Sequence, residues 1–320
     1  MRNRITKWLA FMLTALLLVP CFGVAEELET VDLDEEIEAE GVFEPLPIDF
    51  SIGHVAPESN YTEDGYHDVS ITVRVEKRQT ENAVINIAWV KIADASQFRT
   101  AVTSKGRTNK ISTMARKANA IIAIGGEYFS SDEGGLIVRM GKVQQGRKTP
   151  YKTRDLLAID SEGNFHILIR SKDNKEFNSQ LKALTEQYTL VNVFDFGPAL
   201  IIDGAIHEFP MKSKTEIDYQ FNLGHMEPRC AIGQTGELEY VLVVIDSFKR
   251  DGKSGFTGEE LAQLMLELGC TQAYNLDGGN SCLMVFHGQN YSDKSFEAER
   301  SVSDIIYFAT AVDFGLDSAE

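Results

Sequence analysis

One stretch of the chain, CTQAYNLDGGNSCLMVF from Cys270 to Phe286, constrains the fold more than any other. Two apolar runs of strand character flank Asp277, Gly278 and Gly279. A β-hairpin is the simplest explanation, because Asp-Gly between hydrophobic residues is a strong turn signal. The alternative is a binding corner, in which a carboxylate stands at a strand end beside glycines that let a ligand approach the backbone.

A helix precedes this stretch. The segment GFTGEELAQLMLELGC predicts a helix with Thr257 as its N-cap, Glu260 completing a capping box and Gly269 as its C-terminal stop. The helix leads into the strand TQAYNL, which ends at Asp277. A strand that follows a capped helix and ends in a carboxylate and glycines is therefore one expected unit of the fold.

The same arrangement occurs earlier in the chain. NKISTMARKANAIIAIGGEYF predicts a short helix over about 110–119 and a buried strand over 120–124. This strand also ends in two glycines and a carboxylate, here Glu127. We therefore expect two strand ends with the same chemistry.

The remaining pattern predicts a sheet-rich domain. Alternation in VSITVRVEK and AVINIAWVKI is typical of strands. The chain also contains a weak internal repeat: the pair GLIVRMGKV and LLAIDSEGNFHIL resembles the later pair PALIIDGAI and RCAIGQTGELEYVLV. This repeat predicts two related hairpin units, although chance similarity remains open. No linker divides residues 66–315. We expect one α+β domain with a mixed β-sheet and a few packing helices.

The first 25 residues predict an export signal, with basic residues before an apolar run from Trp8 to Val19. Acylation at Cys21 and an uncleaved membrane anchor remain open, although Pro20 argues against acylation. We expect an exported protein, extracellular or at the cell surface, that contacts a membrane only through this segment.

Charge separates the next segment from the rest of the chain. The formal net charge is −17, and the stretch from Glu26 to Val73 holds fifteen Asp or Glu and no Lys or Arg. Residues 26–65 therefore predict an acidic linker. Nucleic acid is not an expected partner, because no basic stripe is present. Three cysteines beyond the signal, at 230, 270 and 282, fit neither a disulfide framework nor a zinc site, and no metal or cofactor is expected.

Common catalytic motifs are missing from the sequence: it contains no phosphate-binding loop, no dinucleotide fingerprint, no HExxH and no complete GxSxG. Polar residues inserted into apolar surroundings are the more informative signal. They are Glu127, Arg229, Asp246, Asn275, Asp277, Ser281 and Arg300.

Five blocks in order resemble the phosphodiester glycosidase (NAGPA) domain over about residues 110–308: AIGGEYF, FGPALIIDG, PRCAIGQTGELEYVLVVID, GFTGEELAQLMLELGCTQAYNLDGGNS and ERSVSDIIYF. The resemblance implies removal of a sugar, typically N-acetylglucosamine, from a sugar-1-phosphodiester. It also implies a bacterial exported protein related to exopolysaccharide. Two positions depart from the family pattern: Gly125 replaces the usual Asn, and Asp246-Ser247-Phe248 replaces the usual Asp-Gly-Arg.

Cleavage of such a bond builds positive charge on the sugar and negative charge on the departing phosphate. We expect Asp277 to face the anomeric carbon and Glu127 to act as general base or acid. Arg229 and Arg300 are the candidates to bind phosphate with a guanidinium fork. Structural roles remain open for each. Further substrate-binding candidates are Gly126, Tyr128, Asp246, Asn275, Gly278, Gly279, Ser281 and Arg300.

Two other functions remain open. A non-catalytic envelope protein could bind a glycan in the same cleft. An ordinary glycoside hydrolase would be favoured by a buried Glu127 with a raised pKa, because such a carboxyl group is a suitable general acid.

Overall fold

The computed structural model describes residues 42–104, 107–127, 129, 135–149, 154–170, 174–208, 223–247, 254–293 and 298–317. These residues belong to a unit that spans 32–320. The predicted export signal, the first part of the predicted linker and Tyr128 lie outside the described ranges.

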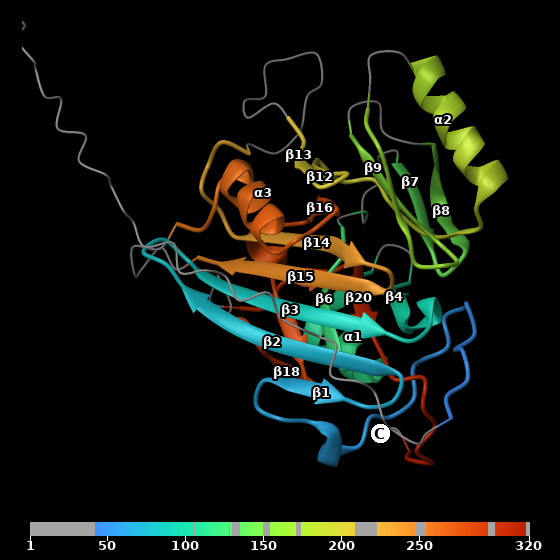
Figure 1. Ribbon diagram of the computed structural model, residues 1–320, viewed down its shortest axis with the longest axis vertical. Helices are drawn as coiled ribbons and strands as arrows, with labels where there is room; N and C mark the ends of the chain where they lie inside the picture. The colour runs from blue at the N-terminus through green and yellow to red at the C-terminus, as the bar shows by residue number, and fades with distance from the viewer. Residues whose placement is uncertain are drawn as a thin grey trace, which may run out of the picture. The chain divides into compact units, whose positions relative to one another are not determined.

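The largest sheet has eight strands and is called the large sheet here (Figure 1). Its order is β1 (Gly65–His67), β2 (Ile71–Gln79), β3 (Val84–Ile92), β15 (Glu239–Asp246), β14 (Arg229–Gly236), β16 (Gln272–Leu276), β12 (Ala199–Ile202) and β13 (Ala205–Ile206). The predicted strands over VSITVRVEK and AVINIAWVKI form β2 and β3. Trp89 of β3 is buried because the guanidinium groups of Arg74 and Arg78 lie over its ring.

Two five-stranded sheets complete the main framework. The β6 sheet has the order β18 (Gln289–Asn290), β17 (Met284–Phe286), β6 (Ile122–Gly125), β20 (Asp304–Phe308) and β4 (Phe98–Val102). The α2 sheet has the order β10 (Phe165–Leu168), β9 (Leu156–Asp160), β11 (Leu190–Phe194), β7 (Gly135–Arg139) and β8 (Lys142–Thr149). A two-stranded pair joins β5 (Asn109–Lys110) and β19 (Ser301–Val302).

Each α-helix packs on a different sheet. α1 (Ile111–Lys117) contacts the β6 sheet, α2 (Asn174–Gln187) contacts β10, and α3 (Gly258–Glu267) contacts β12, β13 and β14 (Figure 1). Short 3₁₀ helices cover Glu58–Asn60 (η1), Ala95–Gln97 (η2) and Gly279–Ser281 (η4). None of the helices in the described part of the chain is long and apolar enough to cross a membrane.

The capping signals predicted for α3 are confirmed. Thr257 Oγ1 accepts a hydrogen bond from Glu260 N (3.2 Å), and Thr257 N donates to Glu260 Oε2 (2.7 Å). Gly269 follows the helix with a φ of +80°, a left-handed conformation that favours glycine. These local interactions set both ends of α3.

The main hydrophobic core draws on all three sheets. Buried side chains of the large sheet, such as Leu242 and Tyr274, belong to the same cluster as Ile124 and Phe308 of the β6 sheet and Phe194 of the α2 sheet. Separate clusters join α1 to the other face of the β6 sheet and α2 to the α2 sheet. The two sides of the β6 sheet therefore face different surroundings.

Both predicted hairpin units are present. β7–β8 and β9–β10 form hairpins in the α2 sheet, whereas β12–β13 and β14–β15 form hairpins in the large sheet. The prediction of a mixed sheet is wrong for the described strands, since every strand pair among them is antiparallel. The reason is that β6 and β16, each delivered by a helix, insert between strands from distant parts of the chain that run the opposite way.

The described end of the predicted linker is part of the folded unit. Leu46 N donates to Ser96 Oγ (2.8 Å), and the Arg99 guanidinium donates to the carbonyl oxygens of Pro47, Asp49 and Ser51 (3.1, 3.2 and 2.9 Å). Arg99 is fully buried and uses these carbonyls to satisfy its donors. Residues that the composition assigned to a solvated linker therefore pack against β4.

Candidate active site

The Asp277 corner connects two different sheets. β16 pairs with β12 and β14 in the large sheet, whereas β17 pairs with β6 and β18 in the β6 sheet. A hairpin would require β16 and β17 to pair with each other, so the hairpin explanation is wrong. The glycines and Asp277 instead occupy a crossing between sheets.

Three strand ends meet at this crossing. Asp277 N donates to Gly126 O (3.2 Å) just beyond β6, and Gly126 N donates to Asp304 O (3.3 Å) at the start of β20. A Cβ atom on residue 126 would lie 2.5 Å from Asp304 Oδ1, which explains the glycine. The backbone therefore brings Glu127, Asp277 and Asp304 into one region.

Gly125 also has a packing reason. A Cβ atom on residue 125 would lie 2.9 Å from the carbonyl oxygen of Ser281, which lies in the connection between β16 and β17. An asparagine at position 125, which is usual in the phosphodiester glycosidase family, would fit only if the backbone around Ser281 moved. The close approach of these two segments accounts for the glycine at this position.

The Glu127 side chain is buried, and the residue is only 3% exposed. Its Oε2 accepts a hydrogen bond from Asp195 N (2.7 Å) and lies 3.6 Å from Arg139 Nη2. Burial raises the pKa of Glu127 to about 8; Arg139 opposes this shift, and the negative charges of Asp304 and Asp195 add to it. Glu127 is thus mainly protonated at neutral pH and can donate a proton.

A buried ion pair supports Glu127. Arg139 Nε donates to Asp304 Oδ2 (2.7 Å), and Arg139 Nη2 lies 2.7 Å from the same oxygen. The other carboxylate oxygen, Asp304 Oδ1, accepts a hydrogen bond from Glu127 N (2.9 Å). The guanidinium of Arg139 also lies 3.8 Å from the centre of the Phe194 ring. Burial raises the pKa of Asp304, and Arg139 counteracts that shift. The pair fixes the backbone from which Glu127 projects.

Asp277 is only partly buried, at the end of β16. Burial raises its pKa to about 6, whereas the Ser281 hydroxyl and the positive charges of Arg300 and Arg154 lower it. Arg300 is exposed, so a cation stands at the surface near this carboxylate. At neutral pH Asp277 is mainly ionised, in contrast to Glu127.

The glycines after Asp277 shape the corner. Gly278 passes so close to Pro228 that a Cβ atom would lie 2.8 Å from its carbonyl oxygen. Gly279 has a φ of +59°, and its N–H donates to the same oxygen (2.9 Å). The 3₁₀ turn that follows returns Ser281 towards Asp277, with Ser281 N donating to Gly278 O (3.1 Å).

Seven of the predicted site residues therefore lie around this crossing. They are Gly126, Glu127, Asp277, Gly278, Gly279, Ser281 and Arg300. Tyr128 falls outside the described residues, so its predicted contact with substrate stays a prediction.

Arg229 borders the crossing with its backbone, since a Cβ atom on Gly278 would lie 3.7 Å from its Cα, but its guanidinium is bonded to other segments. Its Nε donates to Phe256 O (3.0 Å) and its Nη2 donates to His225 O (2.7 Å), and the residue is 3% exposed. These bonds tie β14 to the chain segments before it and before α3. Two sides of the guanidinium fork are thereby used by backbone carbonyls, and burial lowers its pKa.

Asp246 and Asn275 are likewise hydrogen-bonded to other residues of the fold. Asp246 is fully buried, and its Oδ2 accepts from Asn86 Nδ2 (2.7 Å) and Asp293 N (3.0 Å). Burial raises its pKa to about 7. Asn275 Nδ2 donates to Gly197 O (2.9 Å). The structure thus shows both side chains hydrogen-bonded within the fold, and Asp246 and Asp277 both lie near the Cys282 thiol.

The cysteines after the predicted signal are free and buried. Burial raises the pKa of the Cys282 thiol well above its usual range. A Cβ atom on Gly233 would lie 2.4 Å from Cys270 Sγ, which shows how tightly that thiol is packed. Among the residues that the structure describes, no group of three or more His, Cys, Asp or Glu side chains is arranged to hold a metal ion.

Sequence reasoning missed four charged residues of the site: Arg139, Arg154, Asp195 and Asp304. Each is a charged residue within or beside an apolar run of the sequence. The runs are GLIVRM for Arg139, RDLLAI for Arg154, NVFDFG for Asp195 and SDIIYF for Asp304. The signal that selected Glu127 and Asp277 would have found them. Their partners lie far away in sequence, so spacing could not show what they contact.

Comparison with known proteins supports the resemblance seen in the sequence. The phosphodiester glycosidase family model matches residues 118–309, more than half of the chain. The uncharacterized prophage-derived protein YomE of Bacillus subtilis is 31% identical over 206 residues, which is 63% of this chain and 30% of YomE. The match thus spans under a third of that relative.

A solved structure has the same fold. It is the catalytic domain of zebrafish N-acetylglucosamine-1-phosphodiester alpha-N-acetylglucosaminidase, auto-inhibited by its pro-peptide. It is 16% identical with a TM-score of 0.58, covering 85% of this chain and 99% of the zebrafish domain. This likeness confirms the α+β, sheet-rich fold predicted from the sequence. The match of the family model shows that the chain belongs to the phosphodiester glycosidase family.

Proposed function

We propose that this protein is a hydrolase that removes a sugar from a sugar-1-phosphodiester. The observation that carries the proposal is a pair of carboxyl groups on adjoining strand ends with separated pKa values, about 6 for Asp277 and about 8 for Glu127. Between these values one group is ionised and the other protonated, which is the arrangement that acid–base catalysis of glycosyl transfer requires.

Asp277 faces the positive charge that develops on the sugar. Its ionised carboxylate is partly exposed, and the exposed Arg300 beside it is a donor for the phosphate oxygens. Ser281, next to Asp277, is a further candidate for holding the carboxylate or a sugar hydroxyl. Of the two arginines predicted to bind phosphate, Arg300 takes this role in the proposal, because Nε and Nη2 of Arg229 already bind backbone carbonyls.

Glu127 supplies the proton to the departing oxygen. A phosphate group leaves easily and needs little protonation, so a phosphodiester substrate depends less on Glu127 than a glycoside would. A buried, protonated Glu127 therefore favours a second candidate function, hydrolysis of an ordinary glycosidic bond. The two substrates differ in how strongly loss of Glu127 slows the reaction.

N-acetylglucosamine is the sugar we propose for the substrate, by analogy with the named substrate of the zebrafish enzyme that shares the fold. An envelope glycan or exopolysaccharide that carries such a linkage is the proposed source. Export rests on the basic and apolar pattern of the first 25 residues. Fractionation of cells that express the full chain, with a version starting at residue 26 as control, tests export; equal distribution of both would refute it.

The test of function compares substrates and variants of residues 26–320. The substrates are UDP-N-acetylglucosamine as a sugar-1-phosphodiester and nitrophenyl N-acetylglucosaminide as a glycoside. We expect Asp277→Asn to abolish turnover of the phosphodiester, and Glu127→Gln to slow it less than it slows the glycoside, for which a loss of about 10²–10⁴-fold is typical of a missing general acid.

Three other results would change the proposal. Turnover of the glycoside alone would favour the second candidate. Full activity of Asp277→Asn would exclude its catalytic role. No turnover of either substrate, with glycan binding equal in wild type and variants, would support a non-catalytic binding protein instead.

A further inference from the structure

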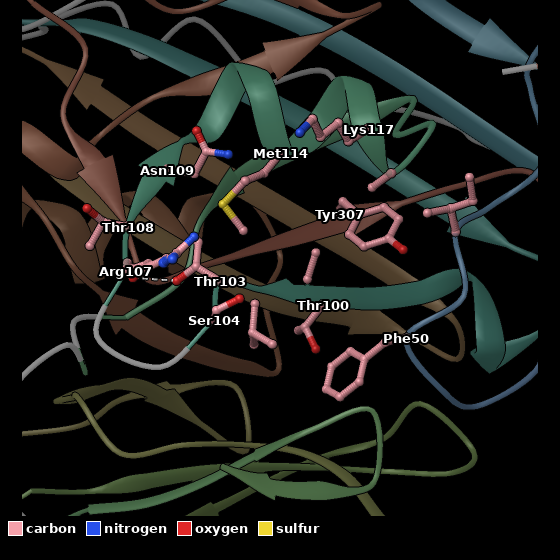
Figure 2. Close-up of a pocket in the computed structure, with 14 residues that line it drawn as sticks. Phe50, Thr100, Thr103, Ser104, Arg107, Thr108, Asn109, Met114, Lys117 and Tyr307 are labelled. Atoms are coloured by element: carbon pink, nitrogen blue, oxygen red, sulfur yellow. Dashed lines mark hydrogen bonds between the residues drawn. The ribbon is translucent and has the colours of Figure 1, made fainter. Parts of the chain in front are cut away.

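A pocket with a volume of about 840 Å³ lies beside α1 (Figure 2). Its walls come from α1, from β4 with the loop that follows it, from residues 50–52 and from Tyr307 of β20. We call it the α1 pocket. Figure 2 shows Met114 and Lys117 on the helix, with Phe50 on the opposite side of β4.

The α1 pocket and the candidate active site use opposite faces of β20. Ile306 and Phe308 belong to the main core, on the same side of the strand as Asp304, whereas Ile305 and Tyr307 belong to the cluster under α1. Successive residues of a strand point to opposite faces. A molecule in the α1 pocket therefore cannot be the substrate held by Asp277 at the same time.

Positive charge is concentrated at the α1 pocket. Arg107 and Lys117 line it, and neither makes an ion pair with another side chain in the described ranges. Residues 105–117 contain five Lys or Arg and no Asp or Glu, in a chain whose net charge is −17. A cluster of positively charged side chains at a pocket attracts anions to that pocket, even in a protein whose net charge is negative.

Neutral hydrogen-bonding groups lie on the Arg107 side of the pocket, and Met114 lies between Arg107 and Lys117 (Figure 2). Ser104, Thr108 and Asn109 line the same side of the pocket. The neighbouring Thr103 hydroxyl is already engaged, because its Oγ1 donates to Arg107 O (2.6 Å). Hydroxyl and amide groups beside cations suit a ligand that has both an acidic group and hydroxyl groups.

An apolar wall completes the pocket. Phe50 is 39% exposed at the rim, with Lys142 Nζ 5.3 Å from the centre of its ring. Met114 and Tyr307 form the inner part, and Tyr307 is held by Arg99 Nε, which donates to its hydroxyl (3.2 Å). An aromatic ring at the rim offers a flat surface to the C–H face of a sugar ring.

We propose that the α1 pocket is a second binding site, for an anionic saccharide: a sugar ring that carries a phosphate or a carboxylate. Arg107 and Lys117 bind the acidic group, the side chains of Ser104, Thr108 and Asn109 bind hydroxyl groups, and Phe50 packs on the ring. The size fits one or two sugar rings, within the range of small-molecule sites. This site does not depend on the hydrolase activity proposed above.

The test is calorimetric titration of residues 26–320 with glucose 6-phosphate, glucuronate, neutral glucose and inorganic phosphate. The variant Arg107→Ala/Lys117→Ala removes the cations of the α1 pocket. Its matched control, Lys110→Ala/Arg116→Ala, removes two positive charges from the same segment outside the pocket, since Arg116 Nη1 points to Gly288 O (3.4 Å). All four side chains are exposed or at the surface, so both variants are expected to fold.

We expect wild type and control to bind glucose 6-phosphate and glucuronate alike, with neutral glucose bound weakly. Affinity for both anions should fall by about tenfold or more in the pocket variant, the scale of one lost charge-assisted contact. Phe50→Ala should weaken binding of glucose 6-phosphate but not of inorganic phosphate.

Three outcomes would overturn the proposal. Equal affinities in the pocket and control variants would show that general charge, not the α1 pocket, attracts the anions. Inorganic phosphate that binds as tightly as glucose 6-phosphate would exclude saccharide recognition. If Asp277→Asn lost anion binding while the pocket variant kept wild-type affinity, the anions would be assigned to the candidate active site. Turnover by both double variants is measured in a separate assay, so a failure of the hydrolase proposal can be told apart from a failure of the α1 pocket proposal.

Discussion

Glu127 and Asp277 stand on adjoining strand ends but in different surroundings. Glu127 is enclosed by Asp195, Arg139 and Asp304, whereas Asp277 is partly open and lies near the exposed Arg300. The fuller burial of Glu127 raises its pKa further above the ordinary value than that of Asp277. Two chemically similar groups thereby acquire different protonation states at neutral pH.

The pH dependence of kcat/KM follows from these two pKa values. Activity should fall as the pH drops below about 6, because Asp277 becomes protonated, and should fall as the pH rises above about 8, because Glu127 loses its proton. Steady-state rates across this range measure the profile. Glu127→Gln should remove the alkaline decline, and a decline that persists in that variant would assign it to another group.

Arg139 is expected to matter for stability as well as for the site. Its side chain is fully buried against Asp304, and removal of one partner leaves an uncompensated buried charge. Arg139→Met should lower the free energy of unfolding by about 3–5 kcal/mol and move the alkaline limb of the pH profile upward. The direction of that move follows because Arg139 lowers the pKa of Glu127.

Urea denaturation and rate measurements test both effects of Arg139→Met. Arg139→Lys is the control, since it keeps the charge but loses the fork, and it should cost less stability. An unchanged unfolding midpoint for Arg139→Met would contradict the structural role of the ion pair.

At the scale of single elements, helix ends and tight turns are set by nearby residues. The hairpin β7–β8 turns at Met140 and Gly141, and β12–β13 turns at Asp203 and Gly204, with positive φ at all four positions. Both turns thus have the left-handed backbone that short hairpins favour. This likeness gives a structural basis to the weak repeat in the sequence.

The α3 cap gives a prediction at this scale. Thr257→Ala removes the acceptor for Glu260 N and should lower the free energy of unfolding by about 1 kcal/mol. Thr257→Ser keeps the hydroxyl and should retain most of the stability. Chemical denaturation of the three proteins compares them, and equal midpoints for Ala and wild type would mean that tertiary packing alone sets the start of α3.

At the scale of the whole molecule, residues before Tyr66 complete the fold. Arg99 binds the carbonyls of Pro47, Asp49 and Ser51, and the Tyr61 ring contacts Tyr66 and Phe286. A chain of residues 42–320 retains this segment and serves as the reference. A chain of residues 66–320 should unfold at a clearly lower urea concentration or fail to fold, because buried Arg99 donors lose their acceptors. Equal stability of the two shorter chains would show that this segment is dispensable.

The crossing at Asp277 also belongs to the whole molecule. It passes from the large sheet to the β6 sheet, and its position beside Glu127 depends on the pairing of β6 with β17 and β20. Hydrophobic contacts between the sheets hold these strand ends together. The candidate active site is therefore a product of how three segments, distant in sequence, converge.

The sequence by itself determined the features that depend on neighbouring residues. Capping by Thr257 and Glu260, the stop at Gly269, the alternation of β2 and β3 and the hairpin turns all have local causes. The unusual carboxylates at the ends of β6 and β16 were also visible, because a charged residue between apolar runs stands out.

Only the tertiary structure decided which of these polar residues meet. Asp277-Gly278 has the same local pattern in a hairpin and in a crossing, and strand pairing alone distinguishes them. The sequence predicts a phosphate ligand at Arg229, whereas in the structure its Nε and Nη2 bind loop carbonyls. Conversely, Arg139 and Asp304 became part of the site because they are 165 positions apart in sequence but bonded in space. Burial and charge contacts between distant residues set the pKa values, and sequence spacing carries no record of them.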